Sequence, residues 1–158
     1  ALRAALTDAF GDVFLPNGTL DRKKLGGIVF SDPAQLDTLN RIVYFHVRRA
    51  VETIRAEKKA CGCALFAVDA INLIQSGLAS LCDVTVGVTA PQEVRLARIM
   101  ARDGIERQYA LLRIRAQEPE SYFRTHCTYI LENGEISQEE FQIQAEALLD
   151  KIIKENAK

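Results

Sequence analysis

Apolar residues recur at the spacing of an α-helix through the N-terminal part of the chain. A stripe from Leu2 to Phe10 predicts one helix, which a glycine and a polar loop end. Residues 20–30 predict a short helical turn that Gly26-Gly27 interrupts. Ser31-Asp32-Pro33 is typical of a helix start, because Ser or Asp can cap free amides and proline is tolerated in the first turn. The pattern then continues almost unbroken to Lys59, which predicts a helical layer with a cationic side.

The apolar period changes at Ala64. Residues 65–68 are a continuous apolar run, which predicts a strand buried on both faces. Residues 83–89 and 128–131 show the same kind of apolar run, and helices separate these three predicted strands. Buried strands that alternate with helices indicate an α/β fold with a parallel sheet, in which ligands gather at the carboxyl ends of strands. The predicted strand ends carry Asp69, Thr89 and Asn133.

Proline and glycine mark further helices in the second half. The predicted helices between the second and third strands span about 91–104, 106–117 and 120–126. After the last strand, Asn133-Gly134 turns the chain. Ser137 and Glu140 then form a capping box, which predicts a final amphipathic helix to about Glu155.

Composition limits the classes of partner. The 158 residues are enough for one compact domain, or for a small domain with an insertion, and 48% hydrophobic content is typical of a globular protein. Twenty basic and twenty-one acidic residues give a net charge of -1, so the surface as a whole does not indicate a nucleic-acid or membrane partner. Any cationic function must therefore be local. No bilayer-length apolar run or N-terminal signal segment is recognised, so we expect cytoplasmic residence.

The cysteines and histidines do not predict a metal site. The four cysteines are scattered, and the close pair Cys61 and Cys63 has no partnering Cys or His nearby in sequence. We expect mostly inert thiols. His46 and His126 lie within helical patterns, where a packing or surface role is more common than a catalytic one. We therefore predict no metal ligand.

One stretch of the second half sets arginines at helical spacing on both sides of an Asp-Gly turn. Arg95, Arg98 and Arg102 are three and four residues apart, so on a helix they project from roughly one face. Beyond the turn, Arg113 and Gln117 are predicted to lie one helical turn apart. Guanidinium groups offer forked donors that match phosphate oxygens, so the pattern is suited to phosphate binding. A solvated helix with arginine stems lying over apolar neighbours is the alternative, and composition alone favours it.

Several segments form an ordered set of motifs along the chain: residues 8–11, 18–22, 29–32, 39–42, Asp69 with 76–78, Arg98 with 100–104, 113–117 and 129–133. In their order and spacing, these segments together resemble the dephospho-CoA kinase family over essentially the whole chain. The resemblance implies an α/β fold of the P-loop NTPase type, like that of nucleoside-monophosphate kinases, with a parallel sheet, a helical substrate domain and a helical lid.

This resemblance also implies a division of the chain. Residues 1–63 would form the helical region that includes the CoA-substrate domain, and residues 64–90 would hold core strands. Residues 91–126 would form the arginine-rich lid region, and residues 127–158 the last core strand and the C-terminal helix.

The family begins with a strand, a phosphate loop and a second strand that carries an aspartate. No Gly-x-x-x-x-Gly-Lys-Ser/Thr motif occurs in the 158 residues. The family's phosphate-loop strand lies in the middle of the sheet, and its loss would leave orphaned ladder groups. We therefore expect that the first strands are missing, and that this sequence is the C-terminal portion of a longer chain and inactive by itself.

Two segments depart from the family pattern. Tyr44-Phe45 stands where the family commonly has His-Pro, so the helix need not kink there. Residues 71–75 replace Pro-Leu-Leu-Phe-Glu, so the neutral amide of Gln75 stands in place of a carboxylate.

The resemblance implies transfer of the γ-phosphoryl group of ATP to the ribose 3′-hydroxyl of dephospho-CoA, with Mg²⁺. Arg113 would contact the transferring phosphate from a closing lid, and Asp69 would hold a magnesium-bound water or orient the ribose, unless it only caps the next helix. Nucleotide binding would involve Arg98, Arg102, Gln117 and Asn133. For Asn133, facing an adenine edge and forming an Asn-Gly turn remain equally open.

The acceptor would lie against the helical region. Its diphosphate suits arginine, so the implied substrate-binding residues are Asp21, Arg22, Arg41 and Arg48. Two other functions remain open. One is a different small-molecule kinase of the nucleoside-monophosphate-kinase type. The other is a non-catalytic CoA- or nucleotide-binding relative, which the absent phosphate loop and Gln75 motivate.

Overall fold

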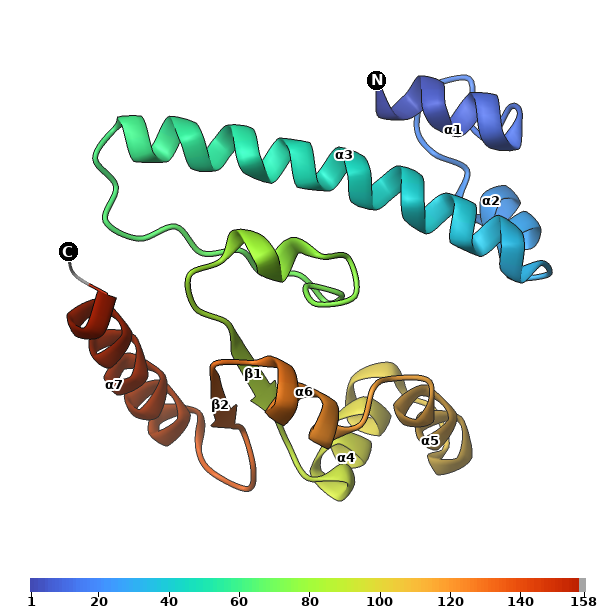
Figure 1. Cartoon of the computed structure of the whole chain (residues 1–158). Coiled ribbons are helices and arrows are strands. Elements are labelled where there is room, and N and C mark those ends of the chain that lie inside the picture. The colour runs from blue at the N-terminus through green and yellow to red at the C-terminus, as the bar shows by residue number, and fades with distance from the viewer. Residues whose placement is uncertain (157–158) are drawn as a thin grey trace. The chain divides into compact units, whose positions relative to one another are not determined.

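The computed structural model describes residues 1–156, and these divide into two compact units, one from Ala1 to Leu81 and one from Cys82 onward. Figure 1 shows the elements along the chain. In order they are α1 (Leu2–Phe10), α2 (Arg22–Val29), α3 (Pro33–Ala60), the 3-10 helix η1 (Leu78–Leu81), β1 (Val86–Thr89), α4 (Gln92–Asp103), α5 (Arg107–Arg115), α6 (Glu120–His126), β2 (Tyr129–Glu132) and α7 (Gln138–Asn156).

In the first unit, α1 and α2 pack against α3. Their shared core consists of Leu6, Phe10, Val13, Leu25 and Val29. The predicted interruption of α2 is wrong, because the helix runs through its glycine pair. Leu25 and Val29 are both buried on either side of that pair, so packing outweighs the low helix propensity of glycine.

The start of α3 is confirmed in detail. The carboxylate of Asp32 accepts a hydrogen bond of 2.9 Å from the backbone N–H of Ala34, and Pro33 occupies the first turn. The helix ends at Ala60, within one residue of the predicted end. Its N-terminal half packs against the core of α1 and α2 through Leu36, Leu39 and Ile42, which stabilises that part of the helix.

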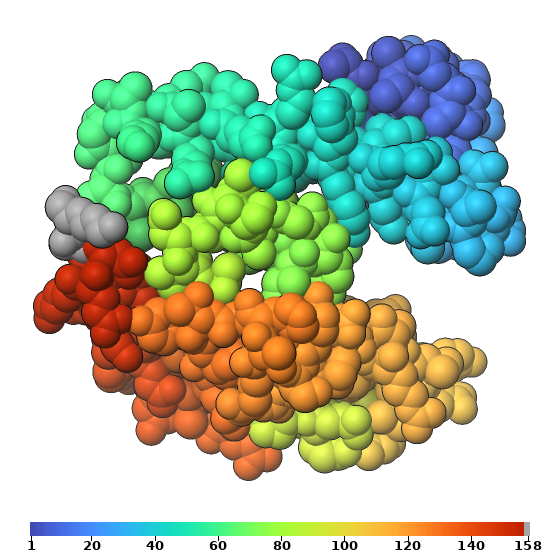
Figure 2. Space-filling view, in the orientation of Figure 1, coloured from blue at the N-terminus to red at the C-terminus, as the bar shows by residue number. Residues whose placement is uncertain are grey.

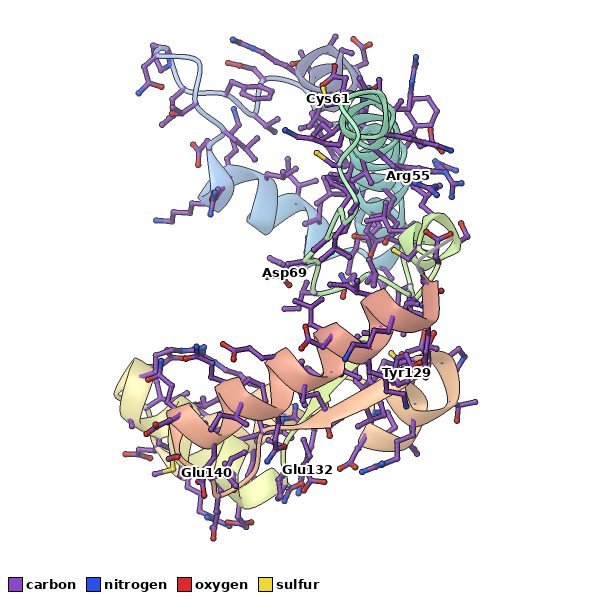
Figure 3. The ribbon with its side chains drawn as sticks, turned by 90° about the vertical axis from the view of Figure 1, so that its left-hand side faces the viewer. Arg55, Cys61, Asp69, Tyr129, Glu132 and Glu140 are labelled. Atoms are coloured by element: carbon purple, nitrogen blue, oxygen red, sulfur yellow. The ribbon has the colours of Figure 1, made fainter. Side chains whose placement is uncertain are left out.

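The predicted strand at residues 65–68 is wrong. The segment is irregular, and no other stretch of residues 1–156 pairs with it. Leu65 is 49% exposed, so the run is not buried on both faces. An apolar run becomes a strand only where a neighbour supplies ladder hydrogen bonds, and here none does. Figure 3 shows Asp69 on this irregular segment, so Asp69 is not at the end of a strand.

In the second unit, β1 and β2 pair in parallel, as predicted, with Val86 opposite Tyr129 and Thr89 opposite Glu132. The first of these strands is shorter than predicted. Helix α6 lies on the sheet (Figure 1) where Gly87 provides room for it. A Cβ at Gly87 would lie 2.9 Å from Cδ1 of Ile130 and 3.1 Å from Sγ of Cys127, so only glycine fits without displacement.

Helices α4 and α5 form a hairpin around the buried residues Leu96, Ala110 and Ile114. Gly104 ends α4 in the left-handed conformation, with φ of 63°, as the predicted turn requires. Helix α5 is shorter than predicted and ends at Arg115, so Gln117 lies beyond it. Figure 2 shows α5 (yellow) and α6 (orange) in one continuous surface.

The predicted capping box of α7 is confirmed. The backbone N–H of Ser137 donates to Oε2 of Glu140 over 2.8 Å, and the backbone N–H of Glu140 donates to Oγ of Ser137 over 3.1 Å. Figure 3 shows Glu140 at the start of this helix. No helix within residues 1–156 has both the length and the apolar character that a membrane span requires.

Candidate functional site

A pocket of about 230 Å³ lies at the carboxyl ends of β1 and β2. This is the edge of a parallel sheet where ligands gather. Residues from both strand ends, from α4 and α6, and from the turn after α5 line it. They are Val88, Thr89, Ala90, Arg95, Arg98, Gln117, Glu120, Phe123 and Asn133. Three of the predicted site residues therefore meet at this one pocket.

Arg98 is tied to the turn that follows β2. Its Nη1 donates to the backbone oxygen of Asn133 over 2.9 Å, and its Nη2 donates to Oδ1 of the same residue over 3.1 Å. Nη2 also donates to the backbone oxygen of Gly134 over 2.9 Å. One planar guanidinium thereby fixes both the backbone and the side-chain amide of Asn133.

Gln117 reaches the pocket from beyond the end of α5. Its Oε1 accepts a hydrogen bond from Nη2 of Arg95, which projects from α4. The backbone N–H of Gln117 donates to the carbonyl of Ile114 over 3.1 Å, which holds the turn after the helix. The prediction that Gln117 and Arg113 occupy successive turns of one helix is therefore wrong, because the helix ends before Gln117.

Thr89 supplies a polar atom without a partner. Its side chain is 7% exposed, and its Oγ1 is buried without a hydrogen-bond partner among the described residues. Buried hydroxyl groups are almost always satisfied, so an unsatisfied one beside a pocket suits a ligand or a water molecule. The sequence placed Thr89 at a strand end, but it offered no signal that the hydroxyl would be unsatisfied.

Arg102 and Arg113 lie around one carboxylate. Nε of Arg102 donates to Oδ1 of Asp103 over 2.7 Å, and Nη2 of Arg102 donates to Oδ2 over 3.0 Å. Arg113 reaches the same Oδ2 from α5 through its Nη1. The hydrogen bond from Arg102 is the main cause that lowers the pKa of Asp103 below its usual range. The two arginines are thus close together, and neither lines the pocket described above.

The predicted residues of the first unit are dispersed. Asp69 is exposed on the irregular segment, and Asp21 caps α2 by accepting a hydrogen bond of 2.9 Å from the N–H of Lys24. Arg48 pairs with Glu52 and donates from Nη1 to Oγ of Ser80 over 3.2 Å, which ties α3 to η1. Arg22 and Arg41 are exposed.

Sequence reasoning left several pocket residues unassigned. Arg95 belonged to the recognised arginine pattern and Thr89 to a recognised strand end, so spacing provided a signal for both. Glu120 and Phe123 had no such signal, because the packing of α6 on the sheet brings them to the pocket. Within residues 1–156, no group of three or more His, Cys, Asp or Glu side chains is arranged to hold a metal ion.

Comparisons with known proteins identify the family of the chain. The family model for dephospho-CoA kinase matches residues 2–138. The dephospho-CoA kinase of Deinococcus radiodurans is 38% identical over 141 residues, which are 89% of this chain and 68% of that protein. That of Lactobacillus johnsonii is 33% identical over 130 residues, 82% of this chain and 66% of that protein. That of Streptomyces avermitilis is 42% identical over 115 residues, 72% of this chain and 55% of that protein.

The fold is similar to the crystal structure of TT1252 from Thermus thermophilus, with a TM-score of 0.69 and 31% identity. That match covers 95% of this chain and 80% of the other. By contrast, the chain spans 55% of the Streptomyces relative and 66% of the Lactobacillus relative. The family model covers most of the sequence, and these curated relatives carry the same family description. The chain therefore belongs to the dephospho-CoA kinase family.

Proposed function

We propose that the protein transfers the γ-phosphoryl group of ATP to the ribose 3′-hydroxyl of dephospho-CoA. The observation that carries this proposal is the family match over residues 2–138, which includes both the arginine-rich hairpin and the strand-end pocket. Phosphoryl transfer needs positioned cations more than covalent chemistry, and this region concentrates arginines around defined partners.

We propose that the strand-end pocket receives the nucleoside part of ATP. The unsatisfied hydroxyl of Thr89 and the amide of Asn133 offer hydrogen bonds to a heterocyclic base, so the residues present fit such a group. The guanidinium of Arg98 donates to Asn133 and Gly134 in the turn after β2. These hydrogen bonds support a role for Arg98 in shaping this pocket more than a direct role at the phosphates. Gln117, held by Arg95, closes the pocket from the hairpin side.

We propose that Arg102 and Arg113 bind the phosphates of ATP, with Arg113 at the transferring group. Both side chains are more than half exposed, at 73% for Arg102 and 54% for Arg113, so their remaining donors are accessible. A guanidinium keeps its charge at any physiological pH and stabilises the charge that spreads over the phosphoryl oxygens. When bound, ATP supplies the phosphoryl group, while these residues orient it and neutralise its charge.

Mg²⁺ belongs to this proposal as the companion of ATP, because magnesium in kinase sites is held largely by substrate phosphates and water. The described residues fit the nucleotide but form no metal-binding group of their own. Asp69 is the carboxylate proposed to orient a magnesium-bound water or the ribose.

On the acceptor side, we propose Arg22 and Arg41 for the diphosphate of dephospho-CoA, because both cations are exposed. The capping role of Asp21 and the ties of Arg48 to η1 support positioning roles for these two residues in place of direct contact.

The experiment is to offer the full protein dephospho-CoA, adenylate and shikimate separately with magnesium-ATP. We expect turnover with dephospho-CoA alone. Turnover restricted to adenylate or shikimate would refute the proposed substrate. Calorimetric binding of dephospho-CoA without any turnover would instead identify a non-catalytic binding protein.

Substitution Arg113→Ala tests the assigned cation. Removal of one transition-state cation lowers kcat by about 100-fold or more. Arg115→Ala is the matched control, because Arg115 is exposed on the same helix and makes no ion pair within the described residues. Unchanged kcat in Arg113→Ala would remove Arg113 from the transition state.

A further inference from the structure

Asp103 joins two arginines that come from different helices. It is the last residue of α4 and accepts two hydrogen bonds from its neighbour Arg102. It also accepts one from Arg113 on α5, across the glycine turn. The carboxylate is 21% exposed, much less than either guanidinium. One anion therefore sets the separation and the orientation of two cations.

The position of Asp103 is unfavourable for the helix alone. An acidic side chain at a helix C-terminus opposes the negative end of the helix dipole, and aspartate has low helix propensity. The arginine contacts offset this cost, and they lower the pKa of Asp103, so the carboxylate is ionised at neutral pH. A local rule that is broken beside a proposed site points to a functional requirement.

We propose that Asp103 is a positioning residue that holds Arg102 and Arg113 together as a single phosphate-binding unit. This inference deepens the proposed function and rests on it for the identity of the anion. Asp103 itself touches neither ATP nor the acceptor, and acts through the two guanidinium groups.

The hydrogen-bond geometry allows Asp103 to stay in place when a phosphate binds. A guanidinium carries five N–H donors, and Asp103 uses a minority of those available on the two arginines. The remaining donors are free to engage phosphate oxygens. Without the shared carboxylate, the two like charges would repel each other, and both long side chains would regain rotamer freedom. Asp103 thus removes an ordering cost before the anion arrives.

The competing explanation for the Asp103 contacts is that they act only as a brace, which means that they stabilise the packing of α4 against α5. The hairpin contains a second ion pair that serves as a control for this explanation. Arg107 on α5 donates from Nη1 and Nη2 to the two carboxylate oxygens of Glu93 on α4, each over 3.1 Å. This second ion pair links the same two helices but touches neither Arg102 nor Arg113. Glu93→Gln therefore weakens the brace and leaves the proposed unit intact.

The kinetic experiment compares Asp103→Asn, which keeps the shape and removes the charge, with Glu93→Gln in the full protein. We expect Asp103→Asn to lower kcat for dephospho-CoA by about 10-fold or more, with KM for ATP changed by less than about threefold. Glu93→Gln should keep kcat within about twofold. In an Arg113→Ala background, Asp103→Asn should lower kcat by a smaller factor than in the wild-type background, because Asp103 then positions Arg102 alone.

Three kinetic results would overturn the inference: wild-type kcat in Asp103→Asn, an equal loss in Glu93→Gln, or the full effect of Asp103→Asn persisting in the Arg113→Ala background. If the wild-type protein does not phosphorylate dephospho-CoA, the proposed function fails, and NMR of the guanidinium N–H groups decides the inference about Asp103. We expect slowly exchanging signals for Arg102 and Arg113 in the wild type and in Glu93→Gln. Both should be lost in Asp103→Asn, and survival of the Arg113 signal there would refute the coupling.

Discussion

Arg98 provides the sharpest test of how the pocket works, because two roles for it predict opposite results for one substitution. If Arg98 acts as a charge on nucleotide phosphates, Arg98→Lys should preserve ATP binding. If Arg98 instead shapes the turn after β2, Arg98→Lys should weaken ATP binding. A single ammonium cannot reproduce the planar fork that reaches Asn133 and Gly134 together.

The expected size follows from the three hydrogen bonds that Arg98 makes. Each contributes about 0.5–1.5 kcal/mol net, and the exposure of the guanidinium favours the lower end of that range. Together they stabilise the turn by about 1.5–2 kcal/mol. Without these hydrogen bonds, ATP binding must itself order the turn, and this cost corresponds to a Kd for ATP about 10- to 30-fold higher. Lysine keeps at most part of this stabilisation of the turn, so we expect the Kd for ATP to rise by about 10-fold in Arg98→Lys.

The assay is calorimetric titration of the full protein with ATP, for wild type, Arg98→Lys, Arg98→Ala and Arg95→Lys. Arg95→Lys is the matched control, because Arg95 also lines the pocket but bonds a single side chain, that of Gln117, and lysine keeps a charged donor at this position. We expect its Kd to stay within about threefold of the wild-type value. Near-wild-type affinity in Arg98→Lys, with a large loss in Arg98→Ala, would refute the positioning role and restore a purely electrostatic one.

Two further predictions concern stability. Gly87→Ala should lower the free energy of unfolding by about 1–2 kcal/mol because a Cβ there would crowd Ile130 on β2 and Cys127 at the end of α6. Gly27→Ala in α2, with nothing within 4 Å, should raise it by about 0.5–1 kcal/mol. Urea denaturation measures both, and equal effects would contradict the packing argument. Ser137 lowers the pKa of Glu140, so the capping box stabilises above that group's unfolded pKa, and this contribution is lost as pH falls through the lower folded pKa. The difference in Tm between wild type and Glu140→Gln should therefore shrink from about pH 7 to about pH 3, and a constant difference would disprove the role of ionised Glu140.

Helix ends and the two paired strands were predictable because their signals are local. The cap at Asp32, the left-handed turn at Gly104 and the box at Ser137 each depend on residues within one turn of the chain. The segment 65–68 was not predictable in this way, since its apolar run satisfies the local rule for a strand while pairing depends on a distant partner. The failure at α2 has the same origin, because the burial of Leu25 and Val29 is a tertiary effect that local glycine propensity does not include.

The sequence by itself determined the family, the order of most elements and the concentration of arginines between β1 and β2, since motif order and helical spacing are properties of the chain alone. Tertiary structure decided which partner each arginine meets. Equivalent spacing along α4 leads Arg98 to the turn after β2 but Arg102 to a carboxylate that it shares with Arg113. The physical reason is that a long, flexible cation binds whichever acceptor the packing of neighbouring elements brings within reach, and that packing is set by contacts distant in the sequence.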